Sequence, residues 1–265
     1  MRVFASLLAA SLALLGTAAA AEAAPRRVAS LNLCTDELLL MLAAPAQIAS
    51  VTHLSRQEAE TPLWRQARAY PRNDGSLLSV VVLRPDLVVS MGGGIRDRTD
   101  ISGRLGIPIV DLVFARSLSD VAENIRRLAA ALGRPEAGTA LLRRLTALIR
   151  SRPPLRVDTI WLGGGGLTVS ATGLEAQWMA LAGLRQRPFR GDRVSLETLI
   201  TRPPALLLRS DYRAGQYSSR QRWLTHPAAR HATGVRTLPT DGRRWTCLGP
   251  LLIEEIERLR REVDR

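Results

Sequence analysis

The two cysteines carry the most reactive side chains in this sequence. Cys34 follows a short apolar run, and Cys247 lies near the C-terminus, next to a Gly- and Arg-containing segment. In an oxidising compartment, two cysteines tend to pair as a disulfide. Alternatively, one or both contact a ligand, for instance as a soft ligand to its metal, or they lie in unrelated positions. The sequence leaves these three possibilities open.

Other side chains have the chemistry to hold a flat or anionic small molecule. His53 could be an axial ligand to haem or cobalt, although a lone loop histidine is more often solvated. Tyr70 and Trp245 could stack on a macrocycle or pack in a core. Arginines could pair with the carboxylates or catecholates of a chelate. The candidates are Arg72, Arg96, Arg209, Arg243 and Arg244.

Two glycine runs, 92–94 and 163–166, each follow an apolar run. Without a Cβ, their backbone N–H groups can approach a ligand closely, but a flexible turn explains them equally well. Neither run fits a P-loop or the dinucleotide fingerprint. The loops after strands are expected to line the binding site. Besides the side chains above, this prediction includes Asn32, Thr35, Gly93, Gly164 and Tyr212.

Composition and motifs argue against several function classes. The chain has no Gly-x-Ser-x-Gly motif and only three scattered histidines, so we predict neither an enzyme nor a metal site of its own. The net charge of +13 comes from scattered arginines, which do not form a nucleic-acid-binding motif. A compositional bias that spreads arginine over solvated surfaces explains this charge. Binding of an anionic ligand is the alternative explanation.

Apolar runs and helical patterns alternate along most of the chain. Residues 28–33, 48–52, 87–90 and 107–113 are predicted strands, and Thr35-Asp36 is expected to cap a helix over 37–42. Residues 156–162, 205–208 and 235–238 repeat the pattern after a purely helical stretch broken at 133–135. The sequence therefore predicts an α/β fold, with two lobes of mainly parallel sheets joined by a long helix.

The N-terminus is typical of a secretory signal peptide. Arg2 precedes an apolar stretch from Val3 to Leu15, and small residues follow up to Ala21-Glu22-Ala23. The apolar stretch is short for a membrane span. We predict cleavage near Ala23 or Ala24 and a soluble periplasmic protein. The expected divisions are a signal peptide over 1–24, an N-terminal lobe over 25–118, a helical connection over 119–154 and a C-terminal lobe over 155–265.

Several fragments in this order resemble the periplasmic substrate-binding proteins of ABC importers for metal chelates, the group that binds cobalamin, haem and ferric siderophores. The fragments are Arg27-Val28-Ala29-Ser30-Leu31, Thr35-Asp36-Glu37-Leu38, Leu83-Arg84-Pro85-Asp86-Leu87-Val88, Leu105-Gly106-Ile107-Pro108-Ile109, Ser195-Leu196-Glu197 and Arg202-Pro203-Pro204-Ala205.

This resemblance implies the class III fold, in which a rigid helix bridges two lobes and a metal chelate binds in the cleft between them. It also implies an inner-membrane permease as partner, a monomer, and no intrinsic cofactor. In such proteins each lobe usually presents a glutamate to the permease. Glu197 matches this position in the second lobe, whereas Leu78 occupies the corresponding position in the first lobe. The alternatives are a haem or metal scavenger that acts without a transporter, and an exported hydrolase.

Overall fold

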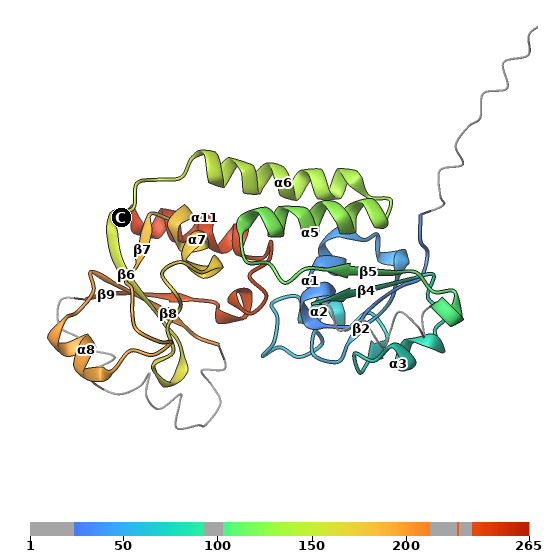
Figure 1. Cartoon of the computed structure of the whole chain (residues 1–265), viewed down its shortest axis with the longest axis horizontal. Helices are drawn as coiled ribbons and strands as arrows, with labels where there is room; N and C mark the ends of the chain where they lie inside the picture. Colours follow the sequence, from blue (N-terminus) through green and yellow to red (C-terminus); the bar gives the residue numbers. More distant parts are fainter. Residues whose placement is uncertain (1–23, 93–102, 213–226, 228–234, 265) are drawn as a thin grey trace, which may run out of the picture.

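The computed structural model describes residues 24–92, 103–212, 227 and 235–264 (Figure 1). The predicted signal peptide therefore lies almost entirely outside the described residues, as do the predicted site residues Gly93 and Arg96. No helix within the described part of the chain has the length and apolar character needed to cross a membrane.

The N-terminal lobe contains a five-stranded parallel sheet with the strand order β3-β2-β1-β4-β5. Its central strands are continuous apolar runs that are buried on both faces, as expected for a parallel sheet covered by helices. The strands are β1 Val28–Ser30, β2 Ile48–Thr52, β3 Arg72–Asn73, β4 Leu87–Met91 and β5 Ile109–Leu112, and the helices are α1 Leu33–Leu42, α2 Trp64–Ala67 and α3 Leu77–Val81.

Helix α1 begins earlier than predicted. The expected cap at Thr35-Asp36 is wrong, because Asn32 is the N-cap residue and its Oδ1 accepts the Thr35 backbone N–H at 3.0 Å. Thr35 in turn accepts the Asn32 backbone N–H at 3.4 Å, which completes a reciprocal capping box. Asp36 is also occupied, since its carboxylate accepts from the backbone N–H and the hydroxyl of Thr52. The first turn of α1 is thereby fixed to the end of β2.

The C-terminal lobe repeats this design with a four-stranded parallel sheet of order β7-β6-β8-β9. Its strands are β6 Val157–Leu162, β7 Leu184–Gln186, β8 Leu206–Ser210 and β9 Arg236–Thr240. Its helices are α7 Leu174–Leu181, α8 Leu196–Thr201 and α11 Leu252–Val263, with short 3₁₀ turns at Gly164–Gly166 and Gly242–Trp245. The predicted class, two α/β lobes with parallel sheets, is confirmed.

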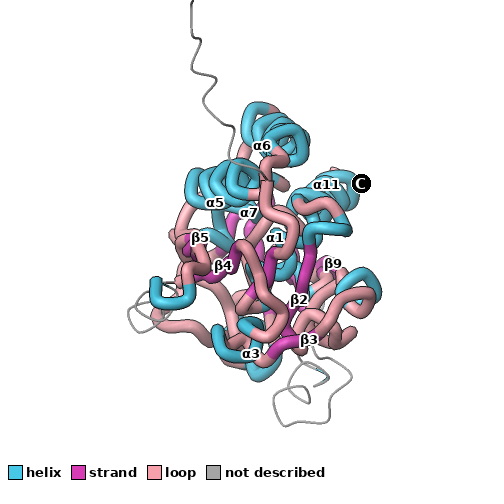
Figure 2. Tube along the Cα trace, turned by 90° about the vertical axis from the view of Figure 1, so that its right-hand side faces the viewer, coloured by secondary structure: helices cyan, strands magenta, loops and turns pink. Residues whose placement is uncertain are grey.

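Two helices connect the lobes, α5 Leu118–Ala131 and α6 Pro135–Arg150. They lie side by side along one edge of the molecule, and α6 extends over both lobes (Figures 1 and 2). Gly133, with a φ of +65°, turns the chain between them, and Pro135 opens α6 at the predicted break. At the far end of α6, Arg260 of α11 donates to the Leu148 carbonyl at 2.6 Å.

One apolar core runs through the bridge. Buried side chains of α1 in the first lobe and of α7 and α11 in the second belong to the same cluster as those of α5 and α6, for example Leu39, Ile125, Leu145, Met179 and Ile256. Separating the lobes would therefore expose apolar surface, which opposes large hinge motions.

Candidate ligand-binding site between the lobes

The sheet topology places two switch points opposite each other across the lobes. Ligands of open parallel sheets bind beyond the carboxyl ends of strands, where neighbouring strands connect in opposite directions. In the first lobe this point lies between β1 and β4, which lead into Asn32 and Met91. In the second it lies between β6 and β8, which lead into Gly163 and Asp211. The space between the lobes is therefore the candidate site.

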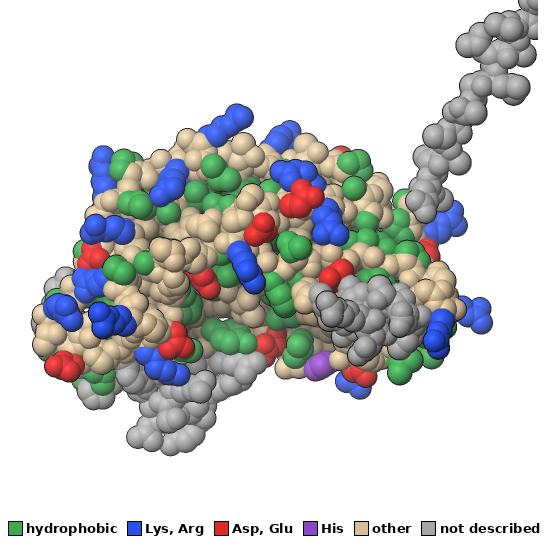
Figure 3. All heavy atoms as spheres, viewed as in Figure 1, with side chains coloured by type: hydrophobic (Ala, Val, Ile, Leu, Met, Phe, Trp, Pro, Cys, Tyr) green, Lys and Arg blue, Asp and Glu red, His purple; other side chains and the backbone are tan. Residues whose placement is uncertain are grey.

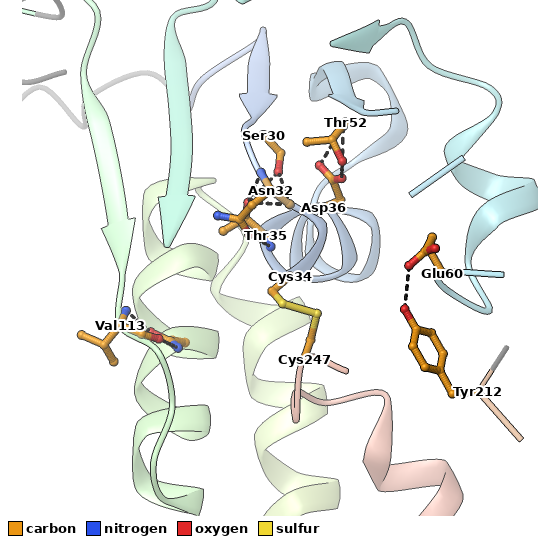
Figure 4. Close-up of a disulfide and its surroundings, with 11 residues drawn as sticks. Ser30, Asn32, Cys34, Thr35, Asp36, Thr52, Glu60, Val113, Tyr212 and Cys247 are labelled. Carbon is orange, nitrogen blue, oxygen red and sulfur yellow. Dashed lines mark hydrogen bonds between the residues drawn. A yellow bond between two sulfur atoms is a disulfide. The ribbon is translucent and has the colours of Figure 1, made fainter. Parts of the chain in front are cut away.

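A disulfide joins Cys34 to Cys247 across this space (Figure 4). Cys34 is the second residue of α1, and Cys247 follows the turn Gly242–Trp245 after β9. Their Cα atoms are 5.3 Å apart. Of the alternatives that the sequence left open, the structure shows the disulfide. In this state neither sulfur is a thiolate that could ligate a metal.

Beside the disulfide lies a cavity of about 140 Å³ to which both lobes contribute. Cys34, Met91 and Phe114 line it from the first lobe, and Cys247, Leu248 and Pro250 line it from the second. Val121 and Asn124 of α5 add the bridge to its wall. The Asn124 side-chain amide accepts the Val113 backbone N–H and donates to the Val113 carbonyl. Most of the other residues that line the cavity are apolar.

Glu37 also lines this cavity and was not singled out as a site residue from the sequence. Its side chain is only 2% exposed, and Oε1 has no hydrogen-bond partner. Burial raises the pKa of Glu37 to about 8, and a hydrogen bond with Thr61 and the charge of Arg244 oppose this rise only in part. Glu37 is therefore mostly protonated at neutral pH. The sequence feature that could have identified Glu37 is its carboxylate directly before the apolar run Leu38-Leu39-Leu40.

A second set of contacts between the lobes lies to one side of the disulfide (Figure 4). The Tyr212 hydroxyl donates to Oε2 of Glu60 at 2.9 Å. Arg243 donates to the Glu58 carbonyl at 2.9 Å while its guanidinium also pairs with Asp241. Glu58 and Glu60 lie in the loop between β2 and α2, where no sequence pattern marked them as contacts.

The structure brings only some of the predicted site residues together. Cys34, Cys247, Tyr212 and Arg244 lie at the surface where the lobes meet, but Arg244 is already bonded to the Leu251 carbonyl and to Glu254. His53 and Arg72 are exposed beyond β2 and in β3, and Arg209 and Gly164 are half-buried at the ends of β8 and β6. Their role in ligand binding stays a prediction.

Both residues that were predicted to stack on a ligand, Tyr70 and Trp245, pack against other parts of the protein. Trp245 is 6% exposed, donates from Nε1 to Oγ1 of Thr240 at 2.8 Å, and meets Trp161 edge-on with ring centroids 6.1 Å apart. Tyr70 packs half-buried against the core of the first lobe. Asn32 and Thr35 are engaged in the α1 cap. Among the described residues, no three His, Cys, Asp or Glu side chains gather as metal ligands.

The two α/β lobes, with a switch point in each sheet, can be compared with known proteins. A family described as periplasmic binding protein matches residues 28–150, which span the first lobe and both bridging helices. No curated protein matches the chain in sequence. The resemblance predicted from the sequence, to periplasmic binding proteins of the metal-chelate type, is confirmed by this match together with the solved structures below.

Solved structures with the same fold come from several such proteins. A periplasmic haem-binding protein from Pseudomonas aeruginosa has a TM-score of 0.62 and 20% identity over 90% of this chain and 92% of that one. The periplasmic vitamin B12-binding protein of Vibrio cholerae has a TM-score of 0.60 and 18% identity, covering 91% and 97%. A siderophore-binding protein bound to ferric acinetobactin has a TM-score of 0.68 and 13% identity, covering 90% and 93%.

Proposed function

We propose that this protein is the solute-binding component of an ABC importer, and that it captures a metal chelate between its lobes and delivers it to a permease. The observation that carries the proposal is the pair of switch points that face each other under a two-helix bridge. Two facing lobes can bury a ligand from both sides while leaving an edge of it open to a partner.

The cargo belongs to the class formed by ferric siderophores, haem and corrinoids. Solved structures with this fold include a haem-binding, a vitamin B12-binding and a siderophore-binding protein. These cargo molecules all bring their own metal, so the binding protein needs no cluster of ligating side chains. The net charge of +13 favours an anionic iron chelate over neutral cobalamin. Basic side chains are dispersed over the face seen in Figure 3, so the field is broad rather than focused.

The disulfide and the N-terminal sequence support a periplasmic location. Disulfides persist in oxidising compartments and are rare in the cytosol. The charged start, short apolar stretch and small residues of positions 1–24 are those of a cleaved export signal.

Ligand titration of the mature protein tests the proposal directly. Haem, cobalamin and several ferric siderophores are added separately while tryptophan fluorescence is followed. We expect one of them to bind with a dissociation constant of about 1 μM or less, because a buried chelate loses most of its hydrated surface. As a control for recognition of the chelate, the metal-free form of the same ligand is titrated in the same way. Failure of every chelate to bind would refute the proposed cargo class.

Substitution of Glu197 tests the importer role. Glu197 is exposed on α8, where it is available to a basic permease surface. The corresponding position in α3 is occupied by Leu78, which is 71% exposed. The first lobe therefore offers the permease an apolar contact instead of a charge. We expect Glu197→Gln to lower uptake through the cognate permease in vesicles about tenfold, the effect of losing about 1.4 kcal/mol, without altering chelate affinity.

The matched control for this experiment is Glu123→Gln, which removes another exposed carboxylate, from the bridge helix α5. It should leave both uptake and affinity unchanged. Equal uptake by the Glu197 and Glu123 variants would argue against a docking role for α8.

A further inference from the structure

The disulfide lies where it restricts relative motion of the lobes most directly. The polypeptide already joins the lobes through the bridge of α5 and α6. The Cys34–Cys247 bond adds a second covalent connection, from the first turn of α1 to the segment after β9, on the face where the lobes meet (Figure 4). A body held at two separate points cannot pivot freely about either one.

Disulfide geometry limits how far the lobes can separate at this point. Bonded cysteines keep their Cα atoms within about 6.8 Å of each other. Here the Cα atoms are already 5.3 Å apart. The lobes can therefore part there by only about 1.5 Å, which is far less than the width of a metal chelate.

The non-covalent contacts could not hold the lobes in the same way. Beyond the disulfide the facing loops are joined by Tyr212 with Glu60 and by Arg243 with the Glu58 carbonyl. Each such hydrogen bond adds only about 1 kcal/mol of net stability, and unlike a covalent bond it can break and reform as the lobes move. Once the disulfide is broken, no covalent bond other than the chain itself joins the lobes in the described part of the structure, and non-covalent contacts and the packing around the bridge resist separation.

Both sulfurs are placed for thiol–disulfide exchange. Cys34 and Cys247 are half-buried rather than enclosed, and both line the 140 Å³ cavity. Cys34 is the second residue of the ten-residue helix α1, where the helix dipole stabilises a thiolate. Since a stabilised thiolate leaves faster, attack at Cys247 with departure of Cys34 is the favoured direction.

From these observations we infer that Cys34–Cys247 is a redox-sensitive lock that holds the two lobes at one separation. In the oxidised protein a ligand is loaded and released without separation of the lobes at their centre. A dithiol reductant opens the lock. Its thiolate attacks Cys247 Sγ, the Cys34 sulfur leaves and takes up a proton, and the second thiol then displaces Cys247, which is also protonated. Two electrons pass to the protein, and the reductant becomes a disulfide.

The lock itself is tested without any cargo, by measuring a distance between the lobes. A ketone-bearing amino acid is placed at Leu78 of α3 and at Ile200 of α8, which are 71% and 61% exposed, and both ketones carry spin labels. We expect one narrow distance distribution in the oxidised protein. After reduction with dithiothreitol the distribution should broaden towards longer distances. An unchanged distribution after complete reduction would overturn the inference.

The sequence offers clean controls, because it contains two cysteines and both are in this bond. The Cys34→Ser/Cys247→Ser variant should have the broad distribution with or without dithiothreitol. Oxidised Tyr212→Phe, which lacks one non-covalent contact, should remain narrow. Broadening of oxidised Tyr212→Phe to the level of the reduced protein would contradict the disulfide as the lock. Far-UV circular dichroism of the reduced wild type verifies folding independently of the variant.

The effect on cargo rests on the proposed function and is measured separately. If a chelate binds, its dissociation should be faster from the reduced than from the oxidised protein, and equal rates would show that the lock does not control release. If no chelate binds in either state, the proposed cargo class fails, while the distance measurement still decides whether the lock exists.

Discussion

Breaking the Cys34–Cys247 bond is expected to lower the free energy of unfolding by about 5 kcal/mol and the Tm by about 10 °C. The two cysteines are 213 residues apart in sequence, so the bond closes a very long loop in the unfolded chain. In the chain-entropy model the stabilisation grows with loop length. Urea unfolding of the wild type with and without dithiothreitol, and of Cys34→Ser/Cys247→Ser, measures the effect.

The double variant is also the control, since its unfolding curve should not respond to dithiothreitol. The urea m-value is informative as well, because an unfolded chain without the cross-link is more extended and exposes more surface. A difference below about 1 kcal/mol between oxidised and reduced wild type would contradict this account and would indicate that the bridge core alone sets the stability.

Replacing Glu37 with glutamine is expected to remove a large part of the pH dependence of stability. Burial raises the pKa of Glu37 from 4.5 to about 8. Between these values the folded state binds more protons at this site than the unfolded state, so the free energy of unfolding falls as pH rises. Between pH 5 and pH 8 this site alone lowers it by about 3 kcal/mol. Glutamine, which cannot ionise, should remove that loss.

The measurement is urea unfolding of wild type and Glu37→Gln at pH 5, 6, 7 and 8. The variant should gain on the wild type as pH rises, with the smallest difference at pH 5. Glu123→Gln, which changes an exposed carboxylate, should follow the wild-type profile. A constant offset between wild type and Glu37→Gln at every pH would show that the Glu37 carboxyl titrates normally.

Local sequence patterns predicted the framework of this protein well. The apolar runs at Val28, Leu87 and Val157 became strands because buried parallel strands have no polar face to interrupt them. Ser76 and Ser195 cap α3 and α8, since a serine side chain satisfies a free N–H at the start of a helix. These features depend on neighbouring residues, which a sequence displays directly.

The site was harder to predict because its residues meet through tertiary structure. The disulfide joins residues from opposite ends of the chain, and only the relative placement of two lobes decides whether they can bond. Glu60 and Tyr212 meet for the same reason. Asn32 and Thr35 were predicted to line the ligand from a loop, but their polar atoms cap the first turn of α1.

The continuous core has a consequence for how such a protein can be divided or recombined. In α6, Leu145 and Leu148 are buried in the core to which both lobes contribute, and the Leu148 carbonyl accepts a hydrogen bond from Arg260 of α11. A chain cut after the bridge would leave these leucines facing water, and a foreign second lobe would have to reproduce the surface of α7 and α11 that covers them. The two halves share an α/β plan, yet each completes the other, so they are not interchangeable modules.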